Sequence, residues 1–185
     1  MKAIPCVRPA VLAAAMLLAS GNALAERDRF FVELNPTEEV PAISSGSLGT
    51  FVTTVDSDAN TIEYELNYSA LTGDVRQAHI HFGQRGVNGG ISVFLCQTTA
   101  NPDPTGNAPT CPPGPAHITG FLRPANVIGP GGQGIAAMEM GELIAAIRSG
   151  IAYVNVHTSV YGGGEIRGQF DGRPLGRRIR IDTDD

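Results

Sequence analysis

Two short segments carry the histidines that could do chemistry. AHIHFG, residues 78–83, places His79 and His81 two positions apart, and YVNVHT, residues 153–158, contains His157. Side chains two apart on a strand share a face with Cα atoms about 6.6 Å apart, so both imidazoles could bind one ion at about 2.0 Å. A third imidazole from a distant strand would complete three nitrogen ligands and leave one position open. The pattern indicates a transition-metal site.

The ligand type narrows the choice of metal. Neutral imidazole suits zinc, copper, nickel or iron, and an all-nitrogen set that is not tetrahedral favours Cu(II). We therefore predict copper, with zinc as the alternative. Two histidines on a strand can also be solvated, or hydrogen-bonded to a neighbouring loop. The metal interpretation is favoured because three of the four histidines fall on strands whose opposite faces are apolar.

Three other polar residues have two interpretations each. His117 follows the proline-rich CPPGPA segment, so its direction is undetermined; a surface position is the simpler interpretation, and we keep it only as a weak fourth ligand. Glu165 and Arg167 either form an exposed cross-strand ion pair of little energetic value, or Arg167 draws a small anion to an open metal position. No G-x-S-x-G, P-loop or H-E-x-x-H motif indicates another catalytic site.

Strands must position these side chains. The chain has 23 Gly, 13 Pro and no Trp, and its short segments alternate apolar with polar residues between turn signals. This pattern predicts an antiparallel sandwich or barrel. The expected strands span residues 29–34, 48–55, 61–68, 75–82, 91–96, 117–122, 152–158 and 164–170.

Alternation assigns the faces of three of these strands. In residues 75–82 the apolar Ala78, Ile80 and Phe82 face the core, which turns His79 and His81 outward. The same parity turns Tyr153, Asn155 and His157 outward on one later strand, and Glu165, Arg167 and Gln169 outward on the last. We therefore expect the three histidines to converge on an outer surface if these strands are neighbours.

One helix and one disulfide complete the expected architecture. In MGELIAAIRSG, residues 140–150, apolar residues recur at helical spacing and Gly150 is a typical C-terminal stop. Cys96 and Cys111 bracket a loop rich in Pro, Asn, Thr and Gly, and they become the only cysteine pair once Cys6 is removed with the leader. A disulfide there would stabilise the fold by about 3 kcal/mol.

The N-terminus is typical of an exported protein. Lys2 and Arg8 precede a short apolar run and an A-x-A site, which predicts a signal peptide over residues 1–25 and no membrane span, since a span needs about 20 apolar residues. The mature chain then has 11 basic side chains, two fewer than the full count of 13, against 18 acidic ones. That balance disfavours nucleic acid as a partner. We expect a secreted or periplasmic protein.

Several motifs, taken in order, resemble one family. EEVPAISSGSLGTF, TIEYELNYSAL, AHIHFGQRGVNGG and GELIAAIRSGIAYVNVHTSVYGGGEIRGQF are similar to the CHRD domain, the module repeated in chordin and found singly in many secreted bacterial proteins. The resemblance implies a CHRD domain over residues 26–172, followed by a charged tail at 173–185. It also implies an all-β, immunoglobulin-like or superoxide-dismutase-like fold: an antiparallel Greek-key barrel or sandwich with one short helix.

A more distant resemblance is to the copper-zinc superoxide dismutases. AHIHFG, YVNVHT and GEIRGQ occur in the order of their motifs, which implies copper ligands at His79, His81 and His157 and an anion-guiding role for Arg167. Only His117 lies between the second and third of these histidines, so the zinc loop and the bridging ligand are missing. The interval from His157 to Arg167 is also short for a dismutase.

Two functions are consistent with the sequence. The first is an exported CHRD protein that binds one copper ion through three outward-facing histidines, with redox or superoxide chemistry at the open position; whether it is an enzyme stays undecided. The second is a non-catalytic extracellular module that binds another exported protein through the GQRGVNGG and Cys96–Cys111 loops, with structural histidines.

Overall fold

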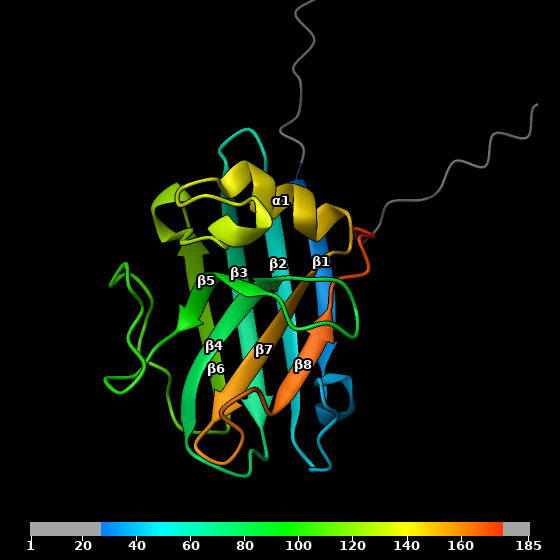
Figure 1. Cartoon of the computed structure of the whole chain (residues 1–185), viewed down its shortest axis with the longest axis vertical. Helices are drawn as coiled ribbons and strands as arrows, with labels where there is room; N and C mark the ends of the chain where they lie inside the picture. Colours follow the sequence, from blue (N-terminus) through cyan, green and yellow to red (C-terminus); the bar gives the residue numbers. More distant parts are fainter. Residues whose placement is uncertain (1–26, 176–185) are drawn as a thin grey trace, which may run out of the picture.

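Eight strands and one α-helix make up most of the regular structure of residues 27–175, the part of the chain that this computed structural model describes (Figure 1). The strands are β1 (Arg27–Leu34), β2 (Leu48–Asp56), β3 (Thr61–Ser69), β4 (Val75–Phe82), β5 (Gly90–Cys96), β6 (Ala116–Leu122), β7 (Ala152–Thr158) and β8 (Ile166–Gln169). The helices are α1 (Met140–Arg148) and the 3-10 turns η1 (Pro36–Glu38), η2 (Pro124–Asn126) and η3 (Gly131–Gln133). Every predicted strand and the predicted helix are confirmed.

The strands form two antiparallel sheets. Their orders are β1-β2-β3-β6 and β5-β4-β7-β8, so the all-β sandwich expected from the sequence is confirmed. We call the second one the histidine sheet, because β4 and β7 carry His79, His81 and His157. The two sheets approach at one edge, where the backbones of Asn35 and Arg167 exchange hydrogen bonds of 3.0 and 3.1 Å.

The core lies between the sheets and follows directly from the alternation. On β1 every second residue is buried, and Phe30, Val32 and Leu34 are at most 3 % exposed. Helix α1 lies across one end of the sandwich (Figure 1) and buries Leu143, Ile144 and Ile147 there. It ends before Gly150, whose φ of 70° is the left-handed conformation that favours glycine after a helix.

One irregularity lies beside the histidines. The register between β4 and β5 shifts twice, between Ala78 and His79 and again between Ile80 and His81. Each shift leaves an extra residue on β5, which is the mark of a β-bulge, and bulges re-aim side chains. As a result Phe94 pairs with His79, while Val93 and Leu95 remain in the core. The alternation of the sequence did not reveal these shifts.

Two predictions concern segments at the ends of the chain. The predicted signal peptide, residues 1–25, lies outside the described residues, and so does residue 26. Of the predicted tail at 173–185, only residues 173–175 are described. Within residues 27–175, no helix has the length and apolar character needed to cross a membrane.

Candidate metal centre

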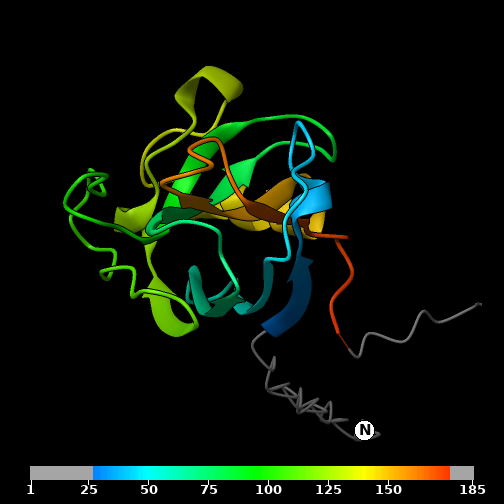
Figure 2. The same ribbon diagram turned by 90° about the horizontal axis from the view of Figure 1, so that it is seen from below.

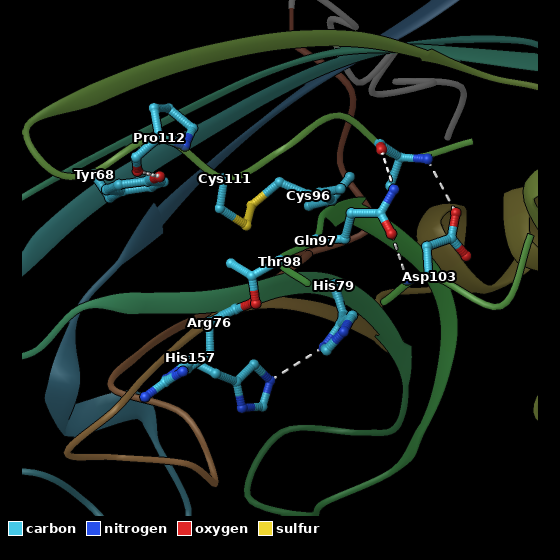
Figure 3. The surroundings of a disulfide bond; sticks show 12 residues. Tyr68, Arg76, His79, Cys96, Gln97, Thr98, Asp103, Cys111, Pro112 and His157 are labelled. Carbon is cyan, nitrogen blue, oxygen red and sulfur yellow. Dashed lines mark hydrogen bonds between the residues drawn. A yellow bond between two sulfur atoms is a disulfide. The ribbon is translucent and has the colours of Figure 1, made fainter. Parts of the chain in front are cut away.

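The three predicted ligands meet on one face of the histidine sheet. β4 and β7 are antiparallel neighbours, with His79 opposite Asn155 and His81 opposite Tyr153. One ring nitrogen from each of His79, His81 and His157 lies within 4.8 Å of the other two. The closest pair is Nδ1 of His79 and Nε2 of His157, at 3.1 Å (Figure 3). The predicted convergence of these side chains is therefore observed.

Their expected exposure is wrong. His79, His81 and His157 are 0, 7 and 6 % exposed, although they lie on the outer face of the sheet. The segment after β4 crosses in front of β7 and β8 and covers this face (Figure 1). Phe94 closes another side, with its ring edge-on to His79 at a centroid distance of 4.3 Å. Loops, which strand alternation does not describe, convert an outward site into a buried one.

Hydrogen bonds fix the tautomers of two histidines. Nδ1 of His81 lies 3.0 Å from the Gly89 carbonyl, and Nδ1 of His157 lies 2.9 Å from the Gly162 carbonyl. Carbonyl oxygens only accept, so both Nδ1 atoms carry the proton and donate. The lone pairs are then on Nε2 of both rings, facing the cluster. This is how metal-binding histidines are usually held, with the other ring nitrogen donating to a backbone carbonyl.

The cluster also contains polar atoms with no partner. Nε2 of His79 and Nε2 of His81 are both buried and neither has a hydrogen bond. A buried nitrogen without a partner costs about 1–3 kcal/mol, so protein structures rarely contain two together. A ring binds one ion through one nitrogen, and on His79 the nitrogen that faces His157 is Nδ1, at 3.1 Å from its Nε2. A metal ion would satisfy the unpartnered Nε2 of His81, so this atom and the donor set fit a transition-metal ion.

The rings are held in the form that binds metals. Burial lowers the pKa of His79 to about 2, and the neighbouring His157 and His81 lower it further. Burial also lowers the pKa of His81 to about 4, against opposing hydrogen bonds from Gly89 and Asn155. The pKa of His157 falls for the same reason, against its bond to Gly162. All three rings are therefore neutral near pH 7, as ligation requires.

A second layer of side chains supports His81. Its ring stacks on Tyr153 with centroids 4.7 Å apart and planes at 3°. The Arg167 guanidinium carbon lies 3.4 Å from the centre of the Tyr153 ring. Arg167 is only 1 % exposed, and its guanidinium donates to Asn88 Oδ1 at 3.1 Å and to the Val87 carbonyl at 2.9 Å. These contacts hold the segment that carries the Gly89 carbonyl.

Those contacts change the interpretation of Arg167 and Glu165. In the described part of the chain no ion pair joins them, so the expected exposed ion pair is wrong. Glu165 is fully buried and instead accepts hydrogen bonds from Ser47, Thr72 and Thr158 at 2.5, 2.7 and 2.7 Å. The anion-guiding role of Arg167 is an untested prediction, and its observed contacts are those of a residue that holds a loop.

His117 does not join the cluster. It lies on β6, in the other sheet, with an exposed side chain whose Nδ1 is 2.7 Å from Oδ1 of Asn67. The proposal of a weak fourth ligand at His117 therefore finds no geometric support. The simpler interpretation, a surface position, agrees with what the structure shows.

Glu39 is a buried carboxylate beside the site that the sequence did not single out. It is 5 % exposed and follows η1, in a segment with no period that would have indicated burial. Burial raises its pKa to about 7, while the nearby positive charge of Arg167 lowers it. Parity placed Tyr153 and Asn155 on the same face as His157, as observed, but the sequence assigned neither of them a role at the site.

The predicted disulfide is confirmed. Cys96 and Cys111 are joined, with Cα atoms 4.9 Å apart (Figure 3). Cys96 ends β5 opposite Ala78, the residue before His79, so the bond attaches the long loop beside the histidine sheet. Within that loop Asp103 accepts hydrogen bonds from the backbone of Thr105, Asn107 and Ala108. The loop is therefore ordered by its own polar contacts as well as by the bond.

Comparison with known proteins supports one of the two resemblances. Searches of curated proteins and of solved structures gave no match, so the likeness to copper-zinc superoxide dismutases finds no support there. The family model described as the CHRD domain matches residues 30–170. That match includes all three clustered histidines and both cysteines of the disulfide. The chain belongs to the CHRD domain family.

Proposed function

We propose that this protein is an exported CHRD domain that binds one copper ion through His79, His81 and His157. The observation that carries the proposal is that one ring nitrogen from each of three buried histidines lies within 4.8 Å of the other two, while Nε2 of His81 is buried with no hydrogen-bond partner. The support for export is the signal-like N-terminus of the sequence together with the Cys96–Cys111 disulfide, since disulfides persist in oxidising compartments.

Copper is the preferred ion for two chemical reasons. The three histidines supply only nitrogen ligands. Sites of this kind bind Cu(II) more tightly than the other first-row divalent ions. The rings are also neutral at physiological pH because burial lowers their pKa values, so copper need not displace protons from them. Zinc is the alternative, since it accepts the same ligands.

Bound copper would supply one-electron redox chemistry. The argument for superoxide as a substrate is the order of the motifs AHIHFG, YVNVHT and GEIRGQ along the chain. This argument rests on the sequence resemblance alone. Metal binding is the core of the proposal, and it stands or falls independently of any catalysed reaction.

The alternative function is a protein-binding module in which the histidines are structural. It is favoured by one observation: the cluster already contains hydrogen bonds that can hold loops without a metal, from His81 to Gly89 and from His157 to Gly162. In that case the histidines would fix the segment after β4 for contact with an exported partner.

Metal titration distinguishes these functions. Purified wild-type protein is titrated with Cu(II), and electron paramagnetic resonance is recorded with the His79→Ala, His81→Ala double variant and with His117→Ala as the matched control. We expect one tightly bound copper with nitrogen coupling in the wild type and in the control, and a loss of affinity greater than about a hundredfold in the double variant.

Equal copper binding by the wild type and the double variant would refute the proposal. A pull-down that captures the same exported proteins with the wild type and with the double variant would then favour the protein-binding function. Elemental analysis of protein purified without added metal identifies whether copper or zinc occupies the native site.

A further inference from the structure

Asn155 lies beside the histidine cluster and has no assigned role. It is on β7, opposite His79 on β4, and its side chain is 2 % exposed. Its Oδ1 atom lies 3.0 Å from Nε2 of His157. Nδ1 of His79 lies 3.1 Å from the same nitrogen. An amide oxygen and an imidazole nitrogen therefore flank one ligand atom of the predicted site.

The contact between Asn155 and His157 joins two acceptors. The proton of the neutral His157 ring is on Nδ1, because that atom faces the Gly162 carbonyl. Nε2 of His157 then presents a lone pair, and so does Oδ1 of Asn155. Two lone pairs at 3.0 Å repel each other unless a positive centre lies beside both. That centre is either a proton, carried by Nε2 of His157 or donated to it by Nδ1 of His79, or a metal ion.

Rotation of the amide would remove the conflict, but Glu39 opposes it. A Cβ atom built on Gly164 would lie 2.2 Å from Oε1 of Glu39 and 2.8 Å from Nδ2 of Asn155, so these two atoms border the same space. Oε1 of Glu39 is buried and has no hydrogen-bond partner, so it is an acceptor without a donor beside the amide of Asn155. The amide nitrogen therefore faces the carboxylate, and Oδ1 faces the histidines.

A proton is the less favourable solution. One donated by Nδ1 of His79 leaves Oδ1 of Asn155 without a partner, and one carried by Nε2 of His157 must serve both neighbours at once. The spacing agrees with the other solution, because ligand atoms that each lie about 2.0–2.1 Å from one ion are about 3 Å apart. His79 Nδ1 and Asn155 Oδ1 have that spacing from His157 Nε2.

We propose that Oδ1 of Asn155 is a fourth ligand of the metal ion, oriented by Glu39, so that the centre has three nitrogen donors and one oxygen donor from the protein. This inference rests on the proposed function and deepens it. Four protein ligands fill the four positions of a zinc ion, or the four strongly bound positions of Cu(II), and leave none of these for water. That is the arrangement of sites that hold a metal rather than of sites that activate a substrate. The chemistry expected at the ion is therefore retention or electron exchange.

The test measures water at copper. Wild type, Asn155→Ala and the control Asn67→Ala are loaded with Cu(II) alone, and pulsed electron paramagnetic resonance in heavy water detects deuterium of a copper-bound water. Asn67 is the matched control because its Oδ1 also contacts a histidine, His117, on the other sheet. We expect a bound-water signal and a Kd about tenfold to a hundredfold weaker in Asn155→Ala only.

The outcomes separate this inference from the proposed function. No copper binding by the wild type refutes the proposed function. Copper binding by the wild type with an unchanged Kd and no new water signal in Asn155→Ala refutes only the role of Asn155.

A second measurement needs no variant at position 155. Wild-type protein with 13C-labelled asparagine is titrated with diamagnetic Zn(II), and the side-chain carbonyl resonances are followed. We expect the Asn155 resonance to shift with zinc while that of Asn67 stays in place. Zinc binding that leaves the Asn155 resonance unmoved overturns the proposal.

Discussion

The outer faces of the two sheets carry the same residue types in opposite environments. On the histidine sheet, Arg167, Glu165, Asn155 and His81 are at most 7 % exposed. On the other sheet or directly after its last strand, the corresponding types are exposed or half-buried: Arg123, Glu65, Asn67 and His117. Both faces obey the same alternation. The difference shows that alternation selects the side of a sheet, whereas covering segments decide whether that side contacts water.

The covering segments are those that follow β1, β4 and β7. In the view from below, loops lie outside the histidine sheet (Figure 2). They are held by its polar residues: Gln169 donates to the Gly83 carbonyl at 2.9 Å, and Ser47 donates to Glu165 at 2.5 Å. The polar residues of this face thus bury themselves by binding the loops that cover them.

The two stacked arginines give the largest expected contrast. Arg167 lies over Tyr153, buried, and Arg123 lies over Phe121, which is 45 % exposed. Arg167→Met removes the hydrogen bonds to the loop and leaves buried carbonyls unpaired, so the free energy of unfolding should fall by about 3 kcal/mol. Arg123→Met should change it by less than about 0.5 kcal/mol. Urea denaturation measures both, and equal effects would contradict the comparison.

The same contrast explains which features the sequence predicted. All eight strands and α1 follow from local alternation and turn residues, and the meeting of His79, His81 and His157 follows from parity once β4 and β7 are neighbours. Burial of the site was not predictable in this way, because it depends on loops without a period. Glu39 illustrates the limit: its position is set by contacts distant in the chain, near Gly164 and Arg167.

Gly89 provides a test of the covering segment itself. A Cβ atom at this position would lie 1.7 Å from the Phe82 carbonyl oxygen, so the backbone must move to accept alanine. Gly89→Ala should destabilise the fold by about 2 kcal/mol through overpacking. It should also lengthen the hydrogen bond from His81 to the Gly89 carbonyl, which 15N resonances of the imidazole would report.

Gly132 supplies the control for this substitution. A Cβ atom there would have no neighbour within 4 Å, so Gly132→Ala should leave stability and the His81 resonances unchanged. An unchanged His81 signal in Gly89→Ala would show that the segment does not position this ring.

The two glutamates give the smallest contrast, and it depends on pH. Burial of Glu165 raises its pKa, but hydrogen bonds from Ser47, Thr158 and Thr72 outweigh burial, and the pKa lies below 4.5. A carboxyl whose pKa is lower in the folded state stabilises the fold at every pH above its pKa in the unfolded state. This stabilisation is lost as the pH falls through its pKa in the folded state. Glu165→Gln should therefore cost about 1.5 kcal/mol at neutral pH.

The cost of Glu165→Gln should shrink as the pH falls below the pKa of this carboxyl in the unfolded state. The wild-type carboxyl then becomes protonated and, like glutamine, uncharged. Glu65→Gln, on the exposed face of β3, should change the free energy of unfolding by less than about 0.5 kcal/mol at any pH. Denaturation curves for both variants between about pH 3 and pH 7 measure the effect. If the destabilisation by Glu165→Gln did not change with pH, the hydrogen bonds of Glu165 would not depend on its charge. The covering segments would then be held by packing and not by a charged acceptor.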